Sequence, residues 1–142
     1  MLYLKYRHTL ALVWFAGGAM LFALVFLMSV RGALAADPAA GWQWMLPNIM
    51  PTLTLIASSY MLPVPGGAAD RPRPVVAQFF RIALGLSVFY LLAVLATMAV
   101  WPLRDSGRLA DWLSLSNLWL GPLQGLAVAA IGVFFVRQAS DD

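Results

Sequence analysis

The sequence predicts an all-α integral membrane protein, a single domain over residues 1–142 built as a bundle of four transmembrane helices. Hydrophobic residues make up 62% of the chain and charged residues only 11%, whereas soluble domains are roughly half apolar and one-quarter charged. The charges leave four long uncharged windows, each with room for the roughly 20 apolar residues that span a bilayer. None of them shows the alternation typical of a transmembrane strand, so helices, which satisfy their own backbone hydrogen bonds, are expected.

The first expected helix covers residues 9–30. Lys5 and Arg7 precede it and the small-residue segment 33–36 follows it, an order that also occurs in secretory signal peptides. The apolar stretch is longer than the roughly 7–15 residues of a signal peptide. We therefore interpret it as a retained membrane anchor.

The second and third expected helices are bounded by tryptophan and proline. The second covers about 42–62 and begins at Trp42 and Trp44, which we interpret as part of the aromatic belt at a membrane interface. The third covers about 80–101 and ends where a proline follows Trp101, since proline cannot continue a helix.

The fourth expected helix covers about 112–136, with Asp111 as its predicted N-cap. Alternatively it begins only at Asn117, and 108–116 lies along the membrane surface. The loop 63–79 is rich in proline and glycine and is predicted to be an extended connection rather than a folded segment.

The distribution of arginine and lysine predicts the orientation in the membrane. Alternating spans place both termini and the segment 63–81 on one side, which carries Lys5, Arg7, Arg71, Arg73, Arg81 and Arg137. The opposite side carries Arg31, Arg104 and Arg108. Because positive charge accumulates in cytoplasmic loops, both termini and this loop are expected in the cytoplasm. An alanine- and arginine-rich chain with one lysine is typical of GC-rich bacteria, so the expected location is a bacterial inner membrane.

The reactive side chains argue against an enzyme. The chain has no cysteine, its only histidine is His8, and its acidic residues are aspartates in predicted loops or at the C-terminus. Membrane hydrolases need a nucleophile with a base, haem needs an axial ligand, and proton-coupled transporters generally need an ionisable group near the midplane. No basic run with interleaved aromatics points to nucleic acid. We therefore predict no catalysis, no cofactor, no metal site and no nucleic-acid partner.

Uncharged polar residues on the second expected helix form the first half of a candidate site. Asn48, Thr52 and Ser59 fall within one face of a helix. Pro47 and Pro51 are helix-bend candidates in the same region, because each removes a backbone donor. This face is the first polar stripe.

A second polar stripe lies on the fourth expected helix. Ser114, Asn117 and Gln124 share one face, beside the helix-bend candidate Pro122. Under the predicted topology the second and fourth helices run in the same direction, so Asn48 and Asn117 are expected at similar depth.

Two interpretations of the stripes remain open. The residues could bond neighbouring helices, at about 0.6 kcal/mol each, or could line a water-accessible path. Four helices are too few to enclose a conduit alone, so the leading hypothesis is a small homo-oligomeric membrane pore or channel-like transport protein, in one form a membrane-permeabilising effector. The alternatives are an accessory or anchor subunit with a membrane or cytoplasmic protein partner, and an uncoupled small-solute carrier.

Overall fold

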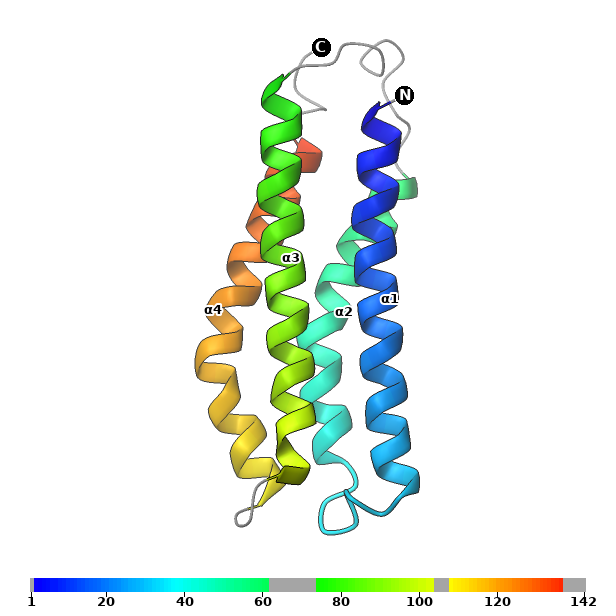
Figure 1. Ribbon diagram of the computed structural model, residues 1–142, viewed down its shortest axis with the longest axis vertical. Coiled ribbons are helices and arrows are strands. Elements are labelled where there is room, and N and C mark those ends of the chain that lie inside the picture. The colour runs from blue at the N-terminus through cyan, green and yellow to red at the C-terminus, as the bar shows by residue number, and fades with distance from the viewer. Residues whose placement is uncertain (1, 62–73, 104–107, 137–142) are drawn as a thin grey trace.

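The computed structural model describes residues 2–61, 74–103 and 108–136, which form a helical bundle whose successive helices alternate in direction (Figure 1). Its helices are α1 (Leu2–Val30), α2 (Ala40–Met61), α3 (Pro74–Val100) and α4 (Leu109–Val136), with a short 3-10 helix, Trp101–Leu103, after α3. The described ranges contain no strand, so the prediction of an all-helical chain is confirmed for them.

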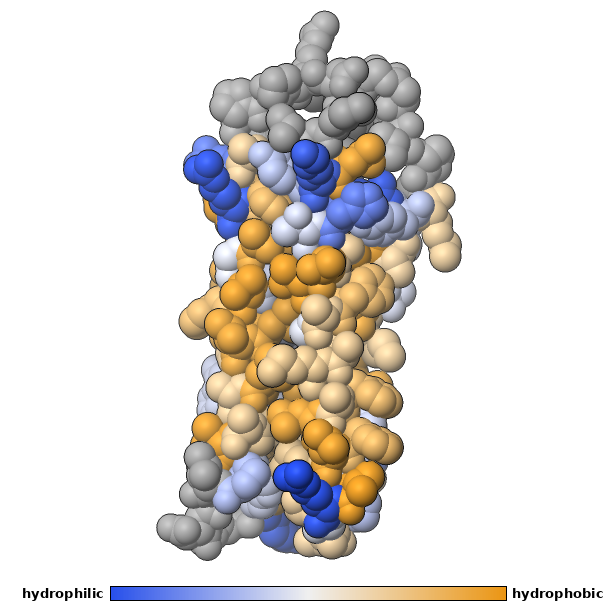
Figure 2. All heavy atoms as spheres, turned by 45° about the vertical axis from the view of Figure 1, so that its right-hand side comes forward, coloured by the Kyte–Doolittle hydropathy of each residue, from blue (hydrophilic) through white to orange (hydrophobic). Residues whose placement is uncertain are grey.

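Three of the helices are long and apolar enough to cross a membrane: α1, α3 and α4. Figure 2 shows a hydrophobic surface over the middle of the bundle and hydrophilic side chains towards both ends. Large apolar side chains face outward, among them Leu12, Phe15, Met20, Phe22, Phe89, Leu92, Leu118 and Leu126. An apolar surface of this extent is unusual on a soluble monomer and supports the prediction of a membrane protein.

The second helix, α2, is less apolar than the other three. Its sequence contains two prolines and the polar residues Gln43, Asn48, Thr52, Thr54, Ser58 and Ser59. These residues lower its hydropathy, so α2 is not among the helices that qualify as a span on composition alone.

Two helices begin earlier than the sequence predicts. The first begins at Leu2 instead of residue 9, because a helix can continue past the charges that bound its apolar part. The third begins at Pro74 instead of residue 80, since proline suits the first helical position, where its missing N–H costs nothing. The predicted extended loop 63–79 is therefore helical from Pro74 onward, and the rest of it lies outside the described residues.

The start of α4 corrects a second prediction. The helix begins at Leu109, so Asp111 lies in the first turn and is not the N-cap. Its carboxylate lies 3.6 Å from Nε of Arg108, and a negative charge in the first turn is favourable beside the helix dipole. The helix is continuous from this point, so it does not begin only at Asn117.

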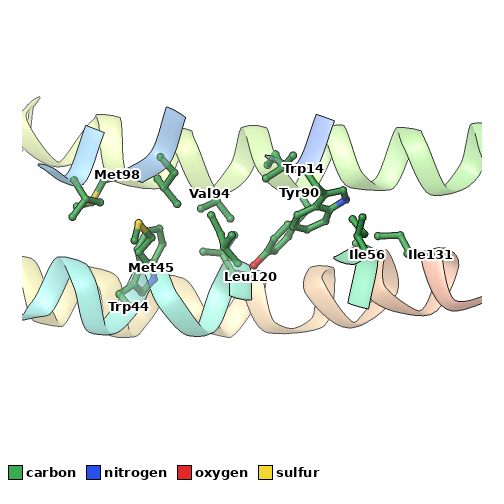
Figure 3. Packing of buried hydrophobic residues seen from close by; sticks show 14 of the residues in the cluster. Trp14, Trp44, Met45, Ile56, Tyr90, Val94, Met98, Leu120 and Ile131 are labelled. Atoms are coloured by element: carbon green, nitrogen blue, oxygen red, sulfur yellow. The ribbon is translucent and has the colours of Figure 1, made fainter. Parts of the chain in front are cut away.

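The helices are arranged so that each packs against two others, in the order α1, α2, α4, α3 around the bundle. Figure 3 shows the core between them, where the indole of Trp14 lies beside the ring of Tyr90. The most deeply buried large side chains include Leu10, Trp14, Leu21, Ile56, Tyr90, Met98, Leu113, Leu120 and Ile131. Gly17 faces Leu91 and Gly18 faces Ile49, so adjacent glycines let α1 approach both of its neighbours closely.

The turn between α1 and α2 contains a Schellman motif. Gly32 has a positive φ of 72°, the left-handed conformation that glycine adopts most readily. The amide of Ala33 donates to the carbonyl of Met28, and the amide of Gly32 donates to the carbonyl of Ser29. These two hydrogen bonds define the motif. Oδ1 of Asp37 then accepts a hydrogen bond from the amide of Ala40, where α2 begins.

Candidate functional site

The two polar stripes meet inside the bundle. The helices α2 and α4 run in the same direction and pack against each other, and Asn48 lies opposite Asn117, with 3.4 Å between Nδ2 and Oδ1. We call the resulting row of hydrogen-bonding groups the polar seam, defined by Trp44, Pro47, Asn48, Tyr90, Ser116, Asn117 and Gln124.

Proline chemistry explains the position of Gln124 in the polar seam. Pro51 has no N–H, so the carbonyl of Pro47, four residues earlier, lacks its usual helical donor. Nε2 of Gln124 donates to that carbonyl over 3.1 Å and to the carbonyl of Asn48 over 3.1 Å. A side chain of α4 thus replaces the backbone bond that proline removes from α2.

Asn48 is the centre of the polar seam and is only 6% exposed. Its Nδ2 donates to the carbonyl of Trp44 over 2.7 Å. The hydroxyl of Tyr90 donates to the backbone carbonyl of Asn48 over 2.8 Å and lies 3.1 Å from its Oδ1. Since Tyr90 belongs to α3, Asn48 connects α2 with both α3 and α4.

Trp44 has a different place from the one the sequence predicts. It is buried, and its Nε1 donates to Oγ of Ser116 over 3.0 Å, so it bonds across the α2–α4 contact and is not part of an interfacial belt. Sequence reasoning missed Ser116. The signal was its register, because it lies three residues after Leu113 and four before Leu120, in line with the apolar residues that α4 buries.

Three of the predicted stripe residues make no hydrogen bond across the polar seam. Thr52 is fully buried beside it, and its Oγ1 has no partner within the described ranges. Ser59 lies near the end of α2 and bonds within its own helix, to the carbonyl of Ile56. Ser114 is exposed on α4.

A second group of polar and small residues remains on the outside of α4, on the face that also carries the exposed Leu118. Ser114, Asn117, Gly121 and Gly125 are all exposed, and we call these four residues the outer face of α4. A Cβ at Gly121 or Gly125 would meet nothing within 4 Å. The helix-bend candidate Pro122, also exposed, lies inside α4 between them.

The prolines and amides together define what the site can do chemically. The amides of Asn48 and Gln124 are engaged by backbone carbonyls and by neighbouring side chains, so the polar seam holds helices together. The outer face of α4 offers an amide, a hydroxyl and two glycine backbones to whatever lies outside the bundle. Comparison of the chain with protein-family models, curated proteins and solved structures gives no match.

Proposed function

We propose that all four helices cross the membrane, with both termini in the cytoplasm of a bacterium. Both α1 and α3 run from the same end of the bundle to the other (Figure 1). If both cross the membrane, the chain between them must return, and α2 is the element that does so. Its 22 residues rise about 33 Å, enough for a hydrocarbon core of about 30 Å. The excess of basic residues near the termini and in the 63–79 loop supports the orientation.

In this membrane we propose a homo-oligomeric, non-enzymatic pore, in which the outer face of α4 lines the axis. The observation that carries this proposal is the exposed part of the second stripe. Asn117 and Gln124 bond to α2 inside the bundle, yet Asn117 also remains exposed, with Ser114 and two glycines beside it on α4. Exposed polar side chains do not stabilise a helix that is surrounded only by lipid. The lining of a path for water or a small polar solute, in contrast, requires them.

An accessory or anchor subunit is the second candidate, and the same face supports it. Glycines and polar side chains are also the residues through which membrane helices pack against partners. In that case a helix of a larger complex would cover Gly121 and Gly125. The carrier hypothesis has less support, because the amides that would surround its solute at the midplane are bonded to the backbone of α2.

Oligomeric state and conductance distinguish these candidates. If the protein is a pore, native mass spectrometry in nanodiscs should show one closed oligomer of about four copies or more. Planar bilayers that contain the protein should conduct. A stable monomer without conductance would contradict the pore and favour the accessory subunit.

Gly121→Leu tests the lining itself. Within the described residues, a Cβ at this position would meet nothing within 4 Å, and leucine is the better helix former by about 0.8 kcal/mol, so the bundle should fold at least as well. The pore proposal expects an oligomer of unchanged size that has lost most of its conductance. Gly85→Leu on α3 is the matched control, because Gly85 is also exposed with nothing within 4 Å. Equal conductance of both variants would contradict a lining by α4.

A further inference from the structure

Arg7 is a charged side chain buried at the end of the bundle that contains the N-terminus. It is only 4% exposed. Its Nη2 donates to the carbonyl of Ser59 in the last turn of α2, and its guanidinium carbon lies 4.0 Å from the ring centroid of Tyr60. Its Nε is buried without a hydrogen-bond partner in the described part of the chain.

The partners of Arg7 are neutral. A carbonyl and an aromatic face stabilise a cation through dipole and quadrupole, but neither cancels its charge. The acidic residues that the described ranges include, Asp37 and Asp111, belong to the α1–α2 turn and the start of α4, at the opposite end of the bundle. A buried charge is costly unless an anion balances it.

Two further residues with basic side chains lie on the same turns of α1 as Arg7. Lys5 and His8 are exposed and are neighbours on α1, since residues three apart share a helix face. Nδ1 of His8 lies 3.2 Å from the hydroxyl of Tyr60, which joins this surface to α2. We call Lys5, Arg7, His8 and Tyr60 the basic end.

The third helix adds another arginine nearby. The ring of Tyr6 stacks on that of Phe80, with centroids 4.3 Å apart. This contact places the first turns of α1 beside the turn of α3 that carries the exposed Arg81. Positive charge thus extends over two of the four helices that meet at this end.

We infer that the basic end binds the phosphate of an anionic phospholipid. The amine of Lys5 can donate to phosphate oxygens, and so can either the imidazole of His8 or the hydroxyl of Tyr60, depending on which of the two donates to the other. The buried charge of Arg7 attracts the anion through a medium that screens little. In a membrane-spanning bundle this end lies at headgroup level, and exposed Leu4 and Leu12 on the same helix offer apolar surface to acyl chains. Basic pockets between membrane helices recognise lipid headgroups in this way.

Lipid retention tests the inference. The protein is reconstituted in nanodiscs of phosphatidylcholine, with or without phosphatidylglycerol, and bound lipid and thermal unfolding are measured by native mass spectrometry and light scattering. We expect selective retention of phosphatidylglycerol and a higher unfolding temperature in its presence. Lys5→Gln and His8→Gln should each lower retention, Lys5→Gln by about fivefold, the contribution of one basic residue near an anionic surface.

Matched variants make the test specific. Arg31→Gln removes a basic residue at the other end of α1 and should leave retention unchanged; equal losses in Arg31→Gln and Lys5→Gln would overturn the inference. Asp70 lies outside the described residues, and Asp70→Asn tests whether a carboxylate of the chain itself is the counter-ion of Arg7. Suppose that Asp70→Asn lowers stability equally in both lipid mixtures, and that Lys5→Gln still retains as much phosphatidylglycerol as the unmodified protein. The counter-ion of Arg7 is then part of the chain, and the lipid site is refuted. Stabilisation by inorganic phosphate in pure phosphatidylcholine, equal to that by phosphatidylglycerol, would also refute it.

Discussion

Trp14→Ala is expected to lower the free energy of unfolding by about 3–5 kcal/mol, the range for truncating a buried tryptophan. Trp14 is completely buried, and its ring centroid lies 5.8 Å from that of Tyr90. The cavity would also loosen Tyr90, whose hydroxyl bonds to Asn48 at the centre of the polar seam. Unfolding of the purified protein by a denaturing detergent measures the loss.

The neighbouring residue provides the control for this prediction. Phe15 is a large aromatic side chain on the same turn of α1, but it is 49% exposed on the outside of the bundle. Phe15→Ala should therefore cost far less than Trp14→Ala. Similar losses of stability for the two variants would show that α1 does not pack into the bundle with the face that carries Trp14.

Gln124→Leu is expected to cost about 1–2 kcal/mol, the upper range measured for a polar contact between membrane helices. Its loss leaves the carbonyl of Pro47 without a donor, because Pro51 cannot supply one. Pro51→Ala restores the backbone N–H, so Gln124→Leu should cost much less in that background. A double-mutant cycle, followed by detergent unfolding, measures this coupling.

Another glutamine serves as the control for the cycle. Gln43 is exposed on α2, and Gln43→Leu should change stability little in either background. If Gln124→Leu costs the same with proline or alanine at position 51, Gln124 does not replace the missing donor, and the explanation of the polar seam is wrong.

The helices themselves could be predicted from the sequence because the bilayer imposes a simple rule of length and hydropathy. Their starts were less predictable. Charges bound the apolar windows, whereas α1 continues through Lys5 and Arg7, and α3 begins with a proline that the sequence pattern assigns to a loop. Hydropathy records where the apolar region ends, but the helix continues for as long as its backbone bonds are satisfied.

The residues of the site could be predicted in part. Asn48 and Asn117 were placed at similar depth from topology, and they lie in contact. The inward position of Trp44 and the role of Ser116 could not be anticipated, because a tryptophan near a helix start occurs at interfaces and in cores alike. The side of a helix that faces its neighbour depends on packing, which a single helix sequence does not record.

The polar seam has a consequence for the proposed pore. Hydrogen bonds that hold α2 to α4 would keep the outer face of α4 in a fixed orientation relative to the rest of the subunit. An oligomer could then present the same four residues of every copy to its axis, without rearranging the bundle.

Access of water to position 121 is the direct test of whether α4 lines a water-filled path. The chain has no cysteine, so Gly121→Cys carries a single thiol near the middle of α4, and Gly85→Cys carries one near the middle of α3. The proposal predicts that a membrane-impermeant thiol reagent modifies Gly121→Cys in intact bilayers and leaves Gly85→Cys unmodified until detergent is added. Protection of both thiols in the bilayer would contradict a water-lined α4 and indicate that lipid or a partner helix covers this face.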